Sequence, residues 1–247
     1  MPEAGGTSLV LHRNLAVFRS LPDLGPTPAY KIRGPLRILA VIGSPEANDE
    51  AGELLNYEAE LARIVAVVDA ARHQGGAYVR MVRYGTVAAI REALVEEPEG
   101  FHVLHLSCHA QPGRLLLENE DGGEYLVDAR RLWEEAVPAG TGLPLVVLSG
   151  CSTGLAVRQA RRGGDAAPAQ GEQALASFAR QLLDRGAAQV VAMQAPVSDA
   201  YATELAAAVY QHLATADVPD ALVAWAEARR CASVPAPSCR RPHLDGG

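Results

Sequence analysis

The stretch LPLVVLSGCSTG, residues 143–154, indicates the fold of this chain. Its first half is an uninterrupted apolar run, which is typical of a β-strand covered on both faces, and its second half places Cys151 among small residues. A second apolar run, FHVLHL at 101–106, leads into SCHA at 107–110. Ligands bind at the carboxyl ends of the strands in an open parallel sheet. A cysteine and a histidine at two such ends therefore indicate a thiol nucleophile and its base.

Strand and helix patterns alternate along the rest of the chain. Apolar runs predict about six strands, at 36–42, 78–83, 101–106, 114–118, 144–149 and 188–193. Helical spacing and capping residues predict helices at 53–72 and 173–184 and helices that start at Thr86, Asp128, Ser198 and Asp217. This alternation predicts an α/β fold, a three-layer sandwich with helices on both faces of a mainly parallel sheet. Two arginines interrupt 78–83, so we expect that strand near an edge.

Length and composition fit a single domain with a sizeable core. The chain has 247 residues, 49% of them hydrophobic, and its formal net charge of −7 at pH 7 argues against a nucleic-acid or anionic-membrane partner. The first residues do not have the pattern of a secretion signal, and no run approaches the ~18 apolar residues of a membrane span, so we expect a cytoplasmic protein. The four cysteines fit that compartment as free thiols.

We expect three parts along the chain. Residues 1–34, which contain several prolines, predict an irregular arm with a short strand near 15–18. Residues 35–231 hold the strands and helices of the domain, and 232–247 form a flexible tail or a truncated linker. Within the domain, 155–171 is rich in glycine and arginine and is expected to be a long exposed loop.

Cys151 is the expected nucleophile, and His109 is its expected base. A cysteine reacts as its thiolate, and a nearby histidine can take the thiol proton and return it to the leaving group. Cys151 lies beyond its apolar run, where a merely packed cysteine would lie within it. His109 follows its strand and is expected in a loop, whereas His102 and His105 lie inside the strand and are expected to pack. Cys108 should point away from His109 and be a packed thiol.

The sequence indicates no metal or nucleotide cofactor. Cys108, His109, Cys231 and Cys239 lack the pairwise spacing of zinc ligands. The segment after the first apolar strand, 42–45, contains neither a dinucleotide-binding glycine motif nor the lysine of a phosphate-binding loop. We therefore expect an enzyme whose chemistry uses groups of its own chain and no cofactor.

Four segments carry a resemblance to a known family. They are HLSCH at 105–109, LLLE at 115–118, PLVVLSGCSTG at 144–154 and AAQVVAMQAPVSD at 187–199. In motif and order they resemble the CHAT domain, a caspase-like cysteine peptidase domain, over roughly 36–230. The resemblance implies a caspase-hemoglobinase fold, hydrolysis of peptide bonds by a Cys-His dyad, and a bacterial signalling or defence setting with a fused or associated sensor module. One departure is Ala110, where this family often has glycine.

The expected reaction is cleavage of a protein or peptide substrate. The Cys151 thiolate attacks the scissile carbonyl, and His109 protonates the departing amine and then activates water. The backbone N–H groups of Ala110 and Cys151 are the expected oxyanion donors. Asp199 follows the last strand and is a candidate for binding a basic substrate side chain, although a carboxylate there also suits the start of a helix.

Two other functions stay open from the sequence. The segment 150–154 also fits the G-x-S-x-G elbow of a serine esterase with Ser152 as nucleophile, followed by Asp199 or Asp217 and then His243. That elbow should open into a long helix, but two glycines follow at 163–164. The domain could also be a latent or inactive caspase-like interaction domain.

Overall fold

The computed structural model describes residues 32, 34–45, 57–72, 76–82, 84–111, 113–149, 178–192, 199–216 and 219–232. The predicted arm, apart from residues 32 and 34, lies outside this part of the chain, as do the loop at 155–171 and the tail from 233. Cys151 also lies outside it.

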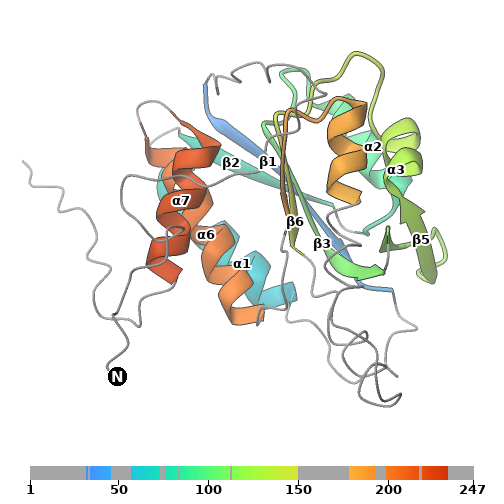
Figure 1. Cartoon of the computed structure of the whole chain (residues 1–247), viewed down its shortest axis with the longest axis horizontal. Coiled ribbons are helices and arrows are strands. Elements are labelled where there is room, and N and C mark those ends of the chain that lie inside the picture. Colours follow the sequence, from blue (N-terminus) through green and yellow to red (C-terminus); the bar gives the residue numbers. More distant parts are fainter. Residues whose placement is uncertain are drawn as a thin grey trace, which may run out of the picture.

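Seven strands form a mixed sheet through the centre of the molecule (Figure 1). Their bounds are Leu36–Gly43 (β1), Ala77–Val82 (β2), Val103–Gln111 (β3), Arg114–Glu118 (β4), Glu124–Asp128 (β5), Leu145–Ser149 (β6) and Gln189–Ala192 (β7). β2, β1, β3, β6 and β7 pair in that order and are all parallel. β4 and β5 extend the carboxyl end of β3 as antiparallel strands. The parallel core and the edge position of β2 are confirmed, whereas β5 was not predicted.

Helices cover both faces of the sheet, as predicted (Figure 1). Tyr57–Arg72 (α1), Asp199–Thr215 (α6) and Ala221–Ala232 (α7) lie together on one face, where α6 packs against the other two. Val87–Glu96 (α2), Ala129–Ala136 (α3) and the helical segment 178–185 cover the other face. The architecture is a three-layer α/β sandwich. No helix in the described part of the chain has the length and apolar character needed to cross a membrane.

Alternation along the strands divides the interior into two cores. Leu39 and Leu106 point to the core beneath α2 and α3, whereas Ile38 and Val103 point to the core beneath α1 and α6. Because both faces are covered, every residue from Leu36 to Val41 is buried. This double burial is the reason that the strand appears in the sequence as an apolar run with almost no polar positions.

Side-chain caps start two helices at the predicted residues. Thr86 Oγ1 accepts a hydrogen bond from the Ala89 N–H at 3.1 Å, and Asp128 Oδ1 accepts one from the Arg131 N–H at 2.8 Å. The predicted start of the last helix at Asp217 is wrong, because α7 begins at Ala221. There the carboxylate of Asp220 accepts from the second and third N–H groups of the helix, which makes Asp220 its cap.

Two glycines let other segments approach the carboxyl end of β1 closely. A Cβ on Gly85 would lie 2.2 Å from the Ile42 carbonyl oxygen, and one on Gly43 would lie 2.8 Å from that of Leu116. The connection from β2 to α2 and the strand β4 therefore both contact the end of β1. These contacts bring β4 to the sheet edge that carries the candidate active site.

Candidate active site

His109 lies within β3 and not in a loop, which corrects the prediction. β1 pairs with β3 as far as Cys108, and β4 then replaces β1 as its neighbour from His109 to Gln111. The strand was predicted to end at Leu106, where the apolar run stops. It continues because the hairpin to β4 supplies backbone partners to polar residues that no apolar pattern marks.

The side chains of His109 and Cys108 belong to opposite faces of the sheet. Cys108 is 2% exposed and packs in the core beneath α2 and α3, which confirms the prediction of a packed thiol. His109 is partly buried, and alternation assigns it to the face of Val103 and His105, which is the face toward α1 and α6.

The carboxyl ends of β3 and β6 lie side by side. The two strands pair in parallel, and Ser107 is the partner of Ser149 in their register. Both serines are buried. His109 follows Ser107 by two positions, and Cys151 follows Ser149 by two positions. The structure thus brings together the strand ends that carry the two predicted residues, although Cys151 itself lies outside the described residues.

His105, which lies in β3, and His102, which directly precedes it, pack in the interior, as predicted. His105 is 1% exposed, and its Nδ1 lies 2.6 Å from the hydroxyl of Tyr210 on α6. His102 is also buried, and its Nδ1 accepts a hydrogen bond from the Arg37 N–H at 3.1 Å. Burial, followed by the charge of Arg37, lowers the pKa of His102 to about 4. The His105 ring therefore joins α6 to β3, and the His102 ring joins the residue before β3 to β1.

Glu118 is a feature of this edge that sequence reasoning missed. It is the last residue of β4, and its Oε1 accepts a hydrogen bond from the Ser44 N–H at 3.0 Å. Its backbone N–H donates to the Gly85 carbonyl at 3.0 Å. Glu118 therefore joins β4 to the exits of β1 and β2. The signals in the sequence are an acidic residue that directly ends the apolar run at 115–117 and the place of LLLE, 115–118, among the segments that resemble the CHAT domain.

Of the other predicted site residues, the structure places Ala110 in β3 and Asp199 at the start of α6. Ala110 lies in β3 opposite Leu115, and its side chain is buried beneath α2 and α3. Asp199 is the first residue of α6, the position that the helix-start alternative predicts, but its side chain is outside the described part. Ser152, Asp217 and His243 lie outside the described residues.

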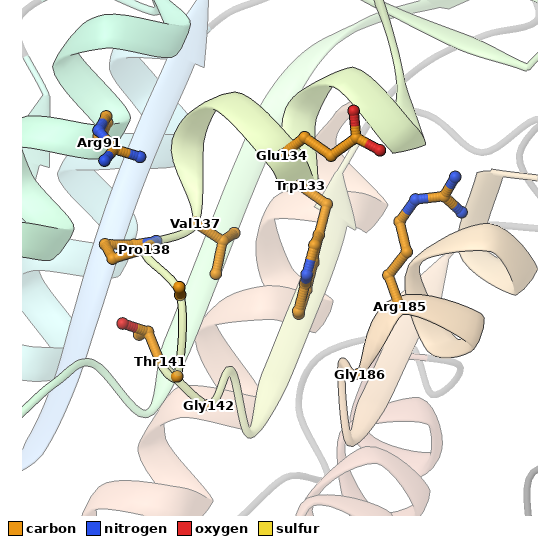
Figure 2. A pocket seen from close by; sticks show the side chains of 11 residues that line it. Arg91, Trp133, Glu134, Val137, Pro138, Thr141, Gly142, Arg185 and Gly186 are labelled. Carbon is orange, nitrogen blue, oxygen red and sulfur yellow. The ribbon is translucent and has the colours of Figure 1, made fainter.

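A cavity of about 610 Å³ lies away from this edge (Figure 2). Residues 137–142, which lead into the amino end of β6, form part of its wall, so it belongs to the opposite edge of the sheet. Figure 2 shows the indole of Trp133 standing between Val137 and Arg185, with Arg91 on the far side of the loop. The cavity is therefore separate from the candidate active site. Among the described residues, no group of three or more His, Cys, Asp or Glu side chains could hold a metal ion.

Comparison with known proteins agrees with this architecture. A search of curated proteins finds none that matches the chain. The family model of the CHAT domain, a caspase-like cysteine peptidase-type domain, matches residues 2–235. The mostly parallel sheet between two helical layers is consistent with a caspase-like α/β sandwich. Since the match covers nearly all of the chain, this protein belongs to the CHAT domain family.

Proposed function

We propose that this protein is a cysteine endopeptidase in which His109 and Cys151 act together on a protein or peptide substrate. The observation that carries the proposal is the register of β3 and β6, in which Ser107 is the partner of Ser149. Two residues of chain lead from each serine to the proposed catalytic residue. Membership of a family of the caspase-like peptidase type supports the same chemistry.

Covalent geometry limits how far Cys151 can lie from the end of β6. Two residues of extended chain span at most about 7 Å, so the Cα of Cys151 stays within that distance of the Cα of Ser149. Paired strands are about 5 Å apart. Because Ser107 and Ser149 are partners, two residues of chain from each serine are short enough to let the side chains of His109 and Cys151 meet.

The proposed reaction uses the imidazole first as a base and then as an acid. His109 takes the proton of the Cys151 thiol, and the thiolate attacks the scissile carbonyl carbon. The tetrahedral intermediate collapses to a thioester when the protonated imidazole gives its proton to the departing amine. His109 then takes a proton from water, whose attack on the thioester releases the acid and restores the thiol. Partial burial leaves His109 a route to the substrate.

The backbone N–H of Ala110 is well directed to serve as an oxyanion donor. A hairpin with a two-residue loop closes on a hydrogen-bonded pair, and bonded and non-bonded pairs alternate along it. By this alternation, the pair of Ala110 and Leu115 is a non-bonded one. The Ala110 N–H is then directed away from β4, toward the β6 side of β3. The bond from the Leu145 N–H to the His102 carbonyl agrees, since it directs the carbonyl of the even-numbered residue just before β3 to β6.

The test is proteolysis that depends on both residues. Purified wild type, Cys151→Ala and His109→Ala are incubated with a peptide library and with a cell extract, and new N-termini are identified by mass spectrometry. We expect new N-termini with the wild type and a loss of at least about a hundredfold in rate with either variant. Thermal unfolding controls for folding of the variants. Equal cleavage by Cys151→Ala would refute the proposal.

Chemical labelling separates the alternatives. Iodoacetamide inhibition that is lost in Cys151→Ala supports the thiol mechanism, whereas fluorophosphonate labelling of Ser152 supports the serine esterase. Absence of any cleavage that depends on Cys151, both alone and in extract, favours an interaction domain.

A further inference from the structure

Among the residues that the structure describes, one carboxylate at the edge of the candidate active site is buried without a cationic partner. Glu118 is only 9% exposed, and the hydrogen bond that its side chain makes is the one from the Ser44 N–H. Across the described residues, no arginine, lysine or histidine forms an ion pair with it. Glutamate is almost never buried to this extent without such a pair. Within the described structure, the Glu118 carboxyl group therefore has a backbone N–H as its hydrogen-bond partner and no cation beside it.

This carboxylate lies on the face of the sheet that carries the His109 side chain. Leu116 is the partner of His109, and Glu118 follows it by two positions on the same face. Partner residues lie about 5 Å apart and two residues of strand span about 7 Å, so the Cα atoms of Glu118 and His109 are within about 10 Å. A peptide whose carbonyl lies at His109 can reach Glu118 with a long side chain.

The hydrogen bond to Ser44 does not explain why a glutamate occupies this position. A glutamine would offer the same kind of oxygen to the Ser44 N–H without the desolvation cost of a buried carboxylate. A cationic ligand offsets that cost, and its N–H groups make short, strong hydrogen bonds to a carboxylate. Oε1 is occupied by Ser44, which leaves Oε2 for one guanidinium or ammonium group.

We propose that Glu118 is a specificity-determining residue that binds the side chain of an arginine or lysine directly before the scissile bond. The inference rests on the peptidase activity proposed above. The net charge of −7 favours the approach of such cationic peptides. Substrates with a neutral or acidic residue at that position would leave the buried carboxylate without a counter-charge.

The test uses two peptide acyloxymethyl ketones, which alkylate the nucleophile of cysteine peptidases. They differ only in the last residue, which is arginine in one and citrulline, its uncharged isostere, in the other. The rate of labelling at Cys151 is measured by mass spectrometry for wild type and for Glu118→Gln, which keeps an acceptor for Ser44. We expect the wild type to react at least about tenfold faster with the arginine probe. In Glu118→Gln this ratio should fall to near one, because the rate with the arginine probe falls.

Glu120→Gln is the matched control, because Glu120 is exposed in the turn after β4 and should not affect the ratio. Thermal unfolding of Glu118→Gln checks that its fold is intact. Equal labelling of wild type by both probes, or an arginine preference that persists in Glu118→Gln, overturns the role of Glu118 and leaves the peptidase proposal standing. Failure of both probes to label wild-type Cys151 overturns the peptidase proposal, and this inference with it.

Discussion

Acidification should destabilise the protein through His102, the buried histidine directly before β3. Its side chain is in contact with Arg37 at both ring nitrogens, because Nδ1 accepts from the Arg37 N–H and Nε2 lies 3.2 Å from the Arg37 guanidinium. Arg37 cannot move away easily, since its guanidinium also donates to the carbonyls of Glu99 and Gly100. Protonation would therefore place a second buried cation beside the first. Burial and then the Arg37 charge lower the pKa of His102 from 6.5 to about 4.

The size and direction of the effect follow from these two pKa values. Between the folded value of about 4 and the unfolded value of 6.5, the unfolded chain binds more protons, so stability falls as the pH falls. The stabilisation is complete above 6.5 and is lost by the time the pH has passed through the folded value of about 4. Proton linkage predicts that the free energy of unfolding falls by about 1.4 kcal/mol from about pH 7.5 to about pH 5.5. The fall reaches about 2.5 kcal/mol by about pH 4.5.

The assay is urea unfolding of wild type and His102→Asn over this pH range. Asparagine keeps an acceptor for the Arg37 N–H but does not titrate. Subtracting the free energy of unfolding of the variant from that of the wild type at each pH removes the contributions of all titrating groups that the substitution leaves unchanged. We expect the wild type to lose stability relative to the variant as the pH falls. Identical pH dependence in both proteins would show that the reasoning about His102 is wrong.

Three further predictions concern packing, capping and self-processing. Tyr210→Phe removes the buried hydrogen bond to His105 and should lower the free energy of unfolding by about 1–3 kcal/mol, measured in urea. Asp220→Ala removes the cap of α7 and should lower the free energy of unfolding by about 1 kcal/mol, whereas Asp220→Asn should lower it much less. Equal losses in the two variants would contradict the capping role. If the protein cleaves after arginine, prolonged incubation should nick it between 158 and 165, and intact mass should find the nick in wild type but not in Cys151→Ala. An active enzyme that stays intact contradicts this last prediction.

The parallel core was predictable because double burial leaves a local mark in the sequence. The run from Leu36 to Ile42 contains one polar residue, and such a run is expected only where both faces of a strand are covered. Thr86 and Asp128 were also predictable, because a cap acts on residues two or three positions away. β5 was missed, because Glu124–Asp128 is mostly polar or half-buried and obtains its backbone partners from β4.

The sequence by itself determined the fold class, the order of its elements and the two strand ends that bear a histidine and a cysteine, since each depends on hydrophobicity and residue type over a few neighbouring positions. Tertiary structure alone decided that Ser107 pairs with Ser149, that β3 extends through His109, and that Glu118 is buried beside the exit of β1. The first and the last of these features depend on contacts between residues 42 and 74 positions apart in the chain, whereas the extension of β3 depends on a hairpin that pairs His109 with Leu116. A pattern over a few neighbouring residues does not record the two long-range contacts, because they depend on which distant segments the fold brings side by side.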